Sequence, residues 1–176
     1  MSRKKQSIIT LTYTIELLDR KHETDQFDCG QEGMNTFLVK HAFKNREVGF
    51  GVTYVLVQTG STRVLGYYTL VAAHMIREES LTFKEQSELP PHDVPIIRLA
   101  RLAVDASEKG KGLSSYLLMD VLRRAVGWSN EIGIRGVDVH TIDDAAVAFY
   151  LKYGFEQLPD ASDHLFIAID TVRQIR

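Results

Sequence analysis

The spacing of hydrophobic positions along the chain predicts strands in some segments and helices in others. Residues 8–17, 52–58 and 64–72 alternate apolar and polar side chains and are rich in β-branched residues, which is typical of strands. A short turn at 59–63 separates the last two, so we expect these two to form a hairpin. Residues 96–104 predict a further strand. The first half of the chain therefore contributes mainly to a sheet.

Helical spacing follows the turn-forming stretch 27–33. The apolar stripe of this first helix consists of Met34, Phe37, Leu38, His41 and Ala42. We expect it to close at Gly49–Gly51, and we expect residues 77–94 to be mostly loop with at most one short helix.

Strand and helix alternate in the second half of the chain. A Gly-containing turn after residue 104 leads into a helix whose inner face carries Leu117, Val121 and Ala125. Residues 137–140 predict a strand, 145–155 a helix that Gly154 ends, and 164–170 a last strand. This order predicts a mixed α/β fold in which helices cover a central sheet.

The composition fits one globular domain over residues 1–176. Apolar residues make up 44% of the 176 residues and charged residues 25%, which excludes collagen-like, disordered and disulfide-scaffold classes. The lone Cys29 has no partner for an internal disulfide, so we expect a reducing, cytoplasmic location. We see neither a signal peptide nor a membrane-spanning run, and we expect no membrane association.

The charge distribution is uneven although the net charge is only −2. The segment from Arg98 to Arg124 contains six basic and three acidic residues. The segment from Asp138 to Asp163 contains six acidic residues and one lysine. An anionic ligand therefore fits the first stretch better. The overall balance argues against a protein that coats nucleic acid but leaves local basic patches open.

The strongest chemical signal is the loop that joins the strand at 96–104 to the next helix. Its glycines allow close backbone approach to an anion, and the helix N-terminus adds free N–H groups and a positive dipole end. Neither a Walker A loop nor the dinucleotide fingerprint is present. The candidate phosphate cradle consists of Lys109, Gly110, Lys111, Gly112, Leu113, Ser114 and Ser115. An ordinary Gly-rich turn is the alternative interpretation.

The second signal is the segment 145–155, in which Phe149 and Tyr150 precede Gly154-Phe155. Asp143 or Asp144 can cap the helix that carries it. Taken alone, Tyr150 is more typical of a packed aromatic residue than of a catalytic one.

Together, the loop and the A-x-x-F-Y-x-x-x-G-F segment resemble the GNAT acetyltransferase superfamily over about residues 95–156. The resemblance implies a mostly antiparallel sheet of about six or seven strands, splayed where acetyl-CoA binds. It implies that Leu102, Ala103 and Val104 line the pantetheine arm and that the 109–115 loop holds the pyrophosphate. Lys109 and Ser114 replace the usual Gln/Arg and Gly/Ala of the loop motif, which keeps a cation and a small side chain.

The resemblance also implies that Tyr150 is the general acid that protonates the leaving CoA thiolate. An ordinary tyrosine stays protonated at neutral pH and can donate. Asp143 stands where the family has an asparagine, and we leave it out of the catalytic set.

Further motifs are similar to the GNAT toxins of bacterial toxin–antitoxin modules, which acetylate the α-amino group of aminoacyl-tRNA and so block translation. They are 27–30, 37–38, 53–55, 66–70 and 101–105. This resemblance implies that Arg101 contacts the acceptor, and implies aminoacyl-tRNA and a ribbon–helix–helix antitoxin as partners. We also expect a homodimer. FDCG at 27–30 reads equally well as a plain loop before a helix.

The chemistry of the acceptor amine gives partial support. An α-amine next to an ester is largely neutral at pH 7 and needs no strong base, unlike a lysine side chain. No histidine makes a metal-ligand spacing with Cys29, so we expect no metal. His140 could line the site, although a hydrogen-bonded structural histidine is the commoner role.

The basic groups available for tRNA are few. They comprise Arg3, Lys4, Lys5, Lys40, Lys44, Arg46, Arg98 and Arg101. In a regular strand Arg98 and Arg101 lie on opposite faces, so we expect only Arg101 to face the cleft. Two alternatives stay open: a GNAT enzyme for a small amine or a protein N-terminus, and a catalytically silent CoA- or partner-binding module.

Overall fold

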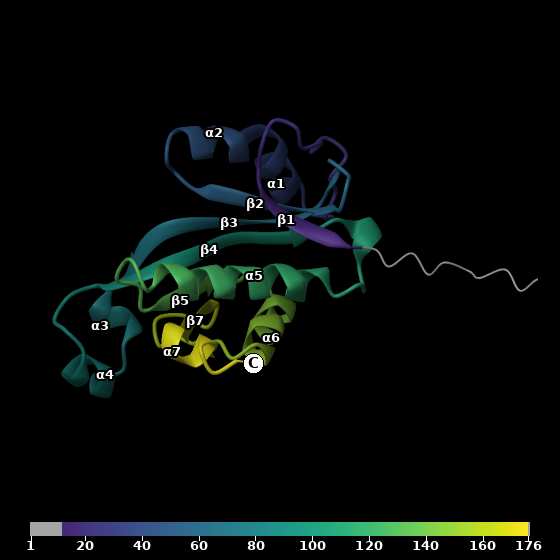
Figure 1. The fold of residues 1–176 in the computed structure, drawn as a ribbon. Coiled ribbons are helices and arrows are strands. Elements are labelled where there is room, and N and C mark those ends of the chain that lie inside the picture. The colour runs from purple at the N-terminus through teal and green to yellow at the C-terminus, as the bar shows by residue number, and fades with distance from the viewer. Residues whose placement is uncertain (1–11, 176) are drawn as a thin grey trace, which may run out of the picture.

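A seven-stranded mixed sheet forms the middle layer of the computed structural model, which describes residues 12–175 (Figure 1). The strand order is β1-β2-β3-β4-β5-β7-β6, and all neighbours pair antiparallel except β4 and β5. The strands are β1 (Tyr13–Leu17), β2 (Val52–Gln58), β3 (Val64–Met75), β4 (Val94–Val104), β5 (Gly136–His140), β6 (Glu156–Gln157) and β7 (His164–Ala168). The mixed, mostly antiparallel sheet expected from the sequence is confirmed.

Helices cover both faces of this sheet (Figure 1). On one face lie α1 (Glu32–Thr36), the π-helical turn η1 (Phe37–His41) and α2 (Ala42–Glu47). On the other lie α5 (Leu113–Trp128), α6 (Asp144–Lys152) and α7 (Ile169–Val172). The short helices α3 (Arg77–Ser80) and α4 (Phe83–Glu88) lie beyond one end of β3 and β4, and a 3-10 turn, η2 (Ala106–Glu108), follows β4.

Two adjacent tyrosines on β3 show how the sheet separates two cores. Tyr67 and Tyr68 are both fully buried but point to opposite faces, as neighbouring strand residues must. The Tyr67 hydroxyl donates to the Met34 carbonyl oxygen of α1 at 2.9 Å. The Tyr68 hydroxyl donates to a carboxylate oxygen of Asp120 on α5 at 2.6 Å. Each core therefore anchors a helix layer to the same strand.

A β-bulge in β4 changes the expected placement of two arginines. Arg101 pairs with Thr69 and Leu99 with Leu70, so the register skips Ala100. Because the extra residue shifts the alternation by one, Arg98 and Arg101 project from the same face of the sheet. The expectation that they lie on opposite faces was wrong, since it assumed a regular strand.

β4 and β5 separate soon after they begin to pair. The parallel register runs only from Ile96 with Gly136 to Arg98 with Asp138. Beyond it, the remaining part of β4 pairs on one side only, with β3. The splayed strand that the family resemblance implied is therefore present.

Several element boundaries differ from the expectations. Residues 77–94 hold two short helices, and a capping box between Thr82 and Glu85 starts the second. The predicted strand at 164–170 stops at Ala168, where α7 begins, and the short β6 was missed. Residues 8–11 of the first predicted strand lie outside the described part. Among residues 12–175, no helix combines the length and apolar character needed to cross a membrane.

Candidate active site

The loop between β4 and α5 has the geometry of an anion cradle. Gly110 and Gly112 have φ values of +80° and +75°, a conformation that side chains rarely adopt. Gly112 is the N-cap of the 16-residue helix α5, and no side chain caps the first turn. The N–H groups of that turn therefore remain available for an anion, which the positive end of the helix dipole also favours.

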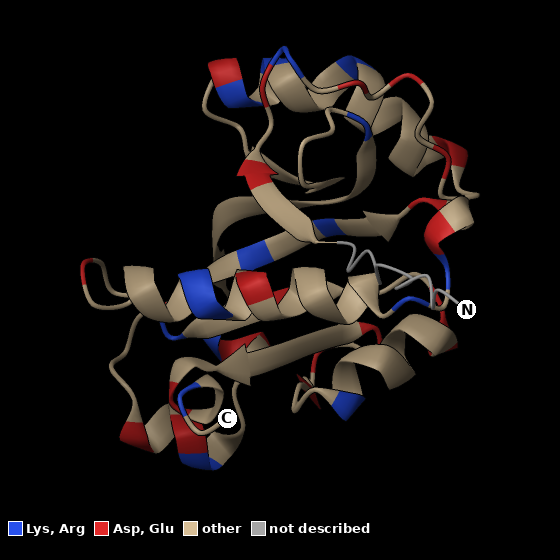
Figure 2. Cartoon of the chain, turned by 45° about the vertical axis from the view of Figure 1, so that its right-hand side comes forward, with Lys and Arg blue, Asp and Glu red and all other residues tan. Residues whose placement is uncertain are grey.

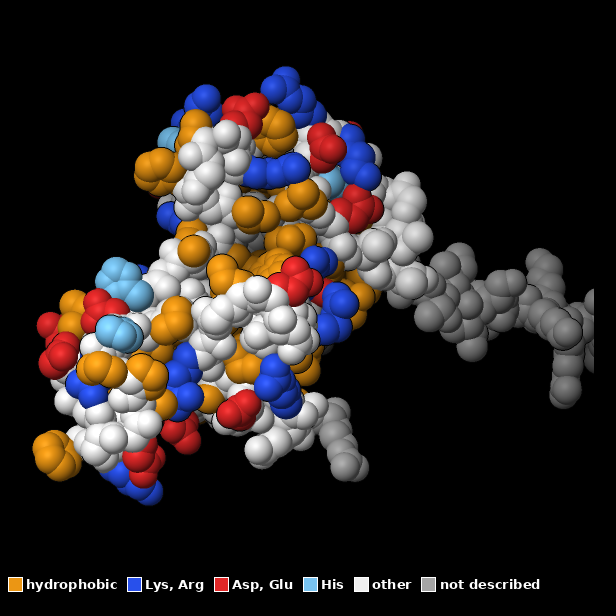
Figure 3. All heavy atoms as spheres, turned by 60° about the vertical axis from the view of Figure 1, so that its left-hand side comes forward, with side chains coloured by type: hydrophobic (Ala, Val, Ile, Leu, Met, Phe, Trp, Pro, Cys, Tyr) orange, Lys and Arg blue, Asp and Glu red, His pale blue; other side chains and the backbone are white. Residues whose placement is uncertain are grey.

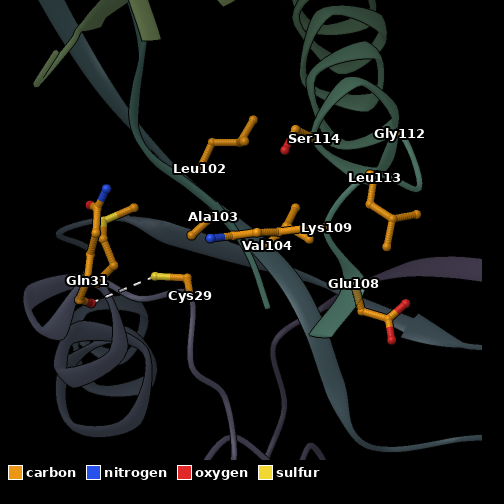
Figure 4. Close-up of a pocket in the computed structure, with 12 residues that line it drawn as sticks. Cys29, Gln31, Leu102, Ala103, Val104, Glu108, Lys109, Gly112, Leu113 and Ser114 are labelled. Carbon is orange, nitrogen blue, oxygen red and sulfur yellow. Dashed lines mark hydrogen bonds between the residues drawn. The ribbon is translucent and has the colours of Figure 1, made fainter. Parts of the chain in front are cut away.

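This cradle opens into a pocket of about 380 Å³ (Figure 4). In Figure 4 the Lys109 side chain extends across the pocket toward Cys29, and Ser114 stands at its rim on α5. The lining comprises Cys29, Gln31, Met34, Leu102, Ala103, Val104, Glu108, Lys109, Gly110, Gly112, Leu113 and Ser114. Eight of the ten residues predicted to bind the cofactor thus line one pocket.

The other two predicted loop residues point elsewhere. The Lys111 ammonium pairs with the Glu108 carboxylate at 2.8 Å, and the Ser115 hydroxyl hydrogen-bonds to the Tyr153 hydroxyl. Neither residue lines the pocket. Sequence spacing included them because it cannot show which way a loop side chain turns.

Two aspartates fasten the segment 27–30 to the end of β4. The buried Asp105 carboxylate accepts from the N–H of Asp28 at 3.0 Å and from the hydroxyl and N–H of Ser107. The Asp28 carboxylate in turn accepts from the N–H of Gly30 and the side-chain amide of Asn35. Burial opposes ionisation of Asp105, but these hydrogen bonds outweigh it and hold its pKa below the ordinary value. The FDCG turn therefore forms part of the pocket floor.

A smaller hollow of about 200 Å³ contains Tyr150 and adjoins the first pocket. Gln31, Met34 and Leu102 line both, so the two hollows adjoin along β4, and we call them together the groove. The remaining residues that line the Tyr150 hollow are Leu99, Ala100, Arg101, Val139, His140, Ile142, Asp143 and Ala146. The groove follows the bulged part of β4 where β5 has separated from it.

Tyr150 sits on α6, which Asp143 caps by accepting from the N–H of Ala146 at 2.7 Å. Edge-on contacts with Phe149 and Phe155 fix its ring, and only 7% of the residue is exposed. Burial raises the pKa of Tyr150 above its ordinary value, so it keeps its proton at neutral pH. Within the described part of the chain its hydroxyl makes no hydrogen bond that would compete with a substrate. A protonated donor therefore stands at the end of the groove.

Arg101 lines the same hollow. Its guanidinium carbon stacks on the Phe37 ring of η1, 3.6 Å from the ring centroid. This contact holds a positive charge beside Tyr150, where the resemblance placed an acceptor contact.

An ionic network lies on the same face where β4, β5 and β7 meet. Arg98 makes a bidentate contact with the fully buried Asp138 carboxylate, at 2.7 Å from Nη2 and 3.0 Å from Nε. The two ring nitrogens of His164 lie 2.8 Å from Asp138 and 2.7 Å from Asp160. Both ring nitrogens of His164 are therefore engaged with carboxylates.

Asp138, His140 and His164 form the one three-residue group of possible metal-binding side chains among residues 12–175. The carboxylate and both nitrogens of His164 are already hydrogen-bonded, and the Arg98 guanidinium faces the carboxylate. A hydrogen-bonded network accounts for these contacts, and a second cation would have to displace them.

Sequence reasoning missed three lining residues near α1. Cys29, Gln31 and Met34 come from a segment about 70 positions before the loop they face. The 27–30 motif signalled the segment, but no spacing rule could place it across the pocket.

A separate apolar hollow of about 440 Å³ lies at the far end of α5, beside Tyr54, Trp128 and Ile134. Figure 3 shows hydrophobic side chains gathered around a hollow on this side of the molecule. None of the predicted site residues lines it.

The comparisons with known proteins identify the family. The model of the "Acetyltransferase (GNAT) family" matches residues 11–155. The chain is 33% identical over 153 residues to a tRNA-acetylating toxin of Mycobacterium tuberculosis, covering 87% of this chain and 90% of that protein. It is 31% identical over 170 residues to a probable toxin TacT of Sinorhizobium fredii, covering 92% and 93%.

Solved structures give the same result. A tyrosine-to-phenylalanine variant of KacT superposes with a TM-score of 0.87 at 34% identity, covering 93% of this chain and 99% of that one. AtaT complexed with acetyl-methionyl-tRNAfMet has a TM-score of 0.85 at 30% identity, covering 92% and 98%. AtaTR bound with acetyl-CoA has a TM-score of 0.80 at 30% identity, covering 92% and 96%. With this fold, this groove and these relatives, the chain belongs to the GNAT family of acetyltransferases.

Proposed function

We propose that this acetyltransferase transfers the acetyl group of acetyl-CoA to the α-amino group of aminoacyl-tRNA, and that it acts in this way as a translation-blocking toxin. The observation that carries the proposal is the groove made of two adjoining hollows, one at the α5 N-terminus and one at Tyr150. The similarity to tRNA-acetylating relatives and to AtaT with acetyl-methionyl-tRNAfMet supports the choice of acceptor.

The groove suits acetyl-CoA in two ways. The uncapped first turn of α5, the positive-φ glycines and Lys109 would hold the pyrophosphate. Leu102, Ala103 and Val104 on the unpaired edge of β4 would hold the pantetheine arm. Bound there, acetyl-CoA supplies an activated thioester.

The chain's own groups would then complete the reaction. A backbone N–H on the free edge of β4 would stabilise the oxyanion that develops as the amine attacks. The protonated, buried Tyr150 would give its proton to the leaving sulfur. Arg101, held on the Phe37 ring, would contact the acceptor beside the reacting amine.

The partners of this toxin follow from the same relatives. AtaT and KacT are found in structures of toxin–antitoxin complexes, including complexes with DNA. We propose a ribbon–helix–helix antitoxin as partner of this chain, together with a homodimeric state, a single domain over residues 1–176 and a cytoplasmic location. A neighbouring gene for such an antitoxin would support the toxin role directly.

The distribution of charge gives the small-amine alternative its strongest support. Basic and acidic residues are interspersed over the helices rather than gathered on one face (Figure 2). Lys40, Lys44 and Arg46 are exposed, but Glu47 lies within 3.7 Å of the Lys44 ammonium. Arg3, Lys4 and Lys5 lie outside the described residues.

A direct assay separates the two acceptors. The purified protein is incubated with acetyl-CoA and charged tRNA, and the aminoacyl end is examined for an acetyl group by mass spectrometry. We expect acetylation of charged tRNA, arrest of a cell-free translation mixture, and an affinity for tRNA that falls steeply with salt. Acetylation of small amines alone, or a flat salt dependence, would favour the alternative.

A further inference from the structure

His140 lies at the Tyr150 end of the groove, where β5 has separated from β4. It is the last residue of β5, just past the point where β5 leaves β4. Its exposed side chain lines the Tyr150 hollow and also a second hollow of about 470 Å³ on the far side, beside Arg98 and His164. The His140 ring therefore faces Tyr150's hollow and a route open to solvent.

The ring of His140 is held in place by a stacking contact with a second histidine. It stacks on the His164 ring with centroids 4.0 Å apart and an interplanar angle of 18°. His164 is itself clamped between Asp138 and Asp160, and Arg98 completes the network. The His140 side chain makes no hydrogen bond among the described residues, so its ring nitrogens are available to a substrate.

We propose that His140 is the proton acceptor of the transfer reaction, taking a proton from the attacking amine while Tyr150 supplies one to the leaving sulfur. The inference rests on the proposed function for the identity of the amine, an α-amino group next to an ester.

Two protons move in this reaction. The amine nitrogen forms a bond to the acetyl carbon and the carbon–sulfur bond breaks. The proton lost by the nitrogen goes to the free imidazole nitrogen of His140, and the phenol proton of Tyr150 goes to the CoA sulfur. Exchange with water then returns the proton from the imidazolium to the tyrosinate through the open hollow.

The electrostatic surroundings keep His140 able to accept. Burial lowers the pKa of His140, and the neighbouring His164 and Arg98 lower it further, while Asp138 and Asp163 oppose them. The charged and titratable groups that face it from the two hollows are Arg101, Asp143, His74, Glu79 and Asp160. The net result is a neutral imidazole at physiological pH, and a neutral imidazole is the form that accepts a proton.

The test uses three variants of the full chain and follows release of the CoA thiol. His140→Ala removes the base and leaves space for a small molecule. His140→Gln replaces the base with a polar group. His92→Ala is the control, because it removes an exposed histidine far from the groove. We expect about a 100-fold or greater loss of rate in both His140 variants and none in His92→Ala. Acetyl-CoA affinity, measured by calorimetry, should stay unchanged in all three.

Imidazole rescue distinguishes a base from a structural residue. Added imidazole should restore much of the His140→Ala rate, and substituted imidazoles should do so in proportion to their basicity. The ratio of wild-type to His140→Ala rates, in which the ionisation of the amine cancels, should fall toward one as pH drops below the His140 pKa.

Three outcomes would overturn the inference. They are wild-type rates in both His140 variants, a rate loss that no imidazole restores, and activity that a chelator removes and Zn²⁺ returns. The assay accepts any amine that the wild-type protein uses. Turnover of a small amine but not of charged tRNA would therefore reject the proposed function and leave the His140 test intact.

Discussion

The two ends of the groove are built on different principles. At the α5 end the cradle is made of backbone: two positive-φ glycines and an uncapped helix turn, with one lysine reaching across. At the end where β4 and β5 separate, the site is made of side chains that α1, β4, β5 and α6 bring together. A phosphate-bearing ligand can be held by backbone N–H groups, whereas an acceptor must be recognised by side chains specific to the chain.

The side-chain end also carries a buried ion pair. Asp138 is fully buried and satisfied by Arg98 and His164, while the exposed Lys111 at the backbone end pairs with the half-buried Glu108. Breaking a buried pair leaves an uncompensated charge, whereas an exposed pair contributes little. Substitutions in the buried pair should therefore lower the free energy of unfolding more than substitutions in the exposed pair.

The largest expected effect is that of Tyr150→Phe on the rate. The change keeps the ring packing against Phe155 and removes only the proton donor, so turnover should fall about 10²–10⁴-fold while acetyl-CoA binding persists. Tyr153→Phe at the C-cap of the same helix removes a hydroxyl that hydrogen-bonds to Ser115 outside the groove, and it serves as the control. Equal, wild-type rates in the two variants would show that Tyr150 is only a packed aromatic residue.

Asp138→Ala should cost the most stability. Removing the carboxylate leaves Arg98 and His164 without their shared buried partner, and we expect a loss of about 3–5 kcal/mol in the free energy of unfolding. Urea denaturation measures it, with Glu108→Ala as the control at the exposed Lys111 pair. A loss below about 1 kcal/mol would mean that the network contributes no more than a surface pair.

Gly112→Val should weaken acetyl-CoA binding at the backbone end. A side chain at this position would meet open space, but the φ of +75° strains any residue other than glycine, so the first turn of α5 must rearrange. Loss of one charge-assisted hydrogen bond lowers affinity about 10–100-fold. Gly60→Val, with a φ of +84° in the β2–β3 turn, imposes the same strain away from the groove. If calorimetry shows unchanged acetyl-CoA affinity in Gly112→Val, the loop is not the phosphate-binding site.

Asp105→Asn tests the link between the segment 27–30 and the cradle, and its expected effect is the smallest. At neutral pH we expect a loss of about 1–3 kcal/mol in the free energy of unfolding, because the Asp28 and Ser107 donors lose an ionised acceptor. The folded-state pKa of Asp105 lies below its ordinary value, so its contribution is complete above the ordinary value and disappears as pH falls through the lower one. The gap between wild type and variant should therefore close on acidification in urea titrations at several pH values. A gap that is independent of pH would contradict the role of the charge.

The sequence by itself determined the parts of this protein that rest on local backbone preferences. The Gly-rich loop and the α5 helix after it, the β2–β3 hairpin and the Asp143-capped helix carrying Tyr150 all depend on residues within a few positions of one another. Periodicity and turn chemistry act over that range, so these elements could be predicted, and with them the family resemblance.

Only the tertiary structure decided the acceptor end. The bulge at Ala100 turned Arg98 to the face of Arg101, and the sheet brought His140 and Asp138 beside His164, more than 20 positions away in the chain. Such contacts are fixed by strand register and by the burial of charge against charge, and neither leaves a periodic trace in the sequence. The same limit applied to Cys29 and Gln31, which reach the groove because Asp28 and Asp105 hold two distant segments together.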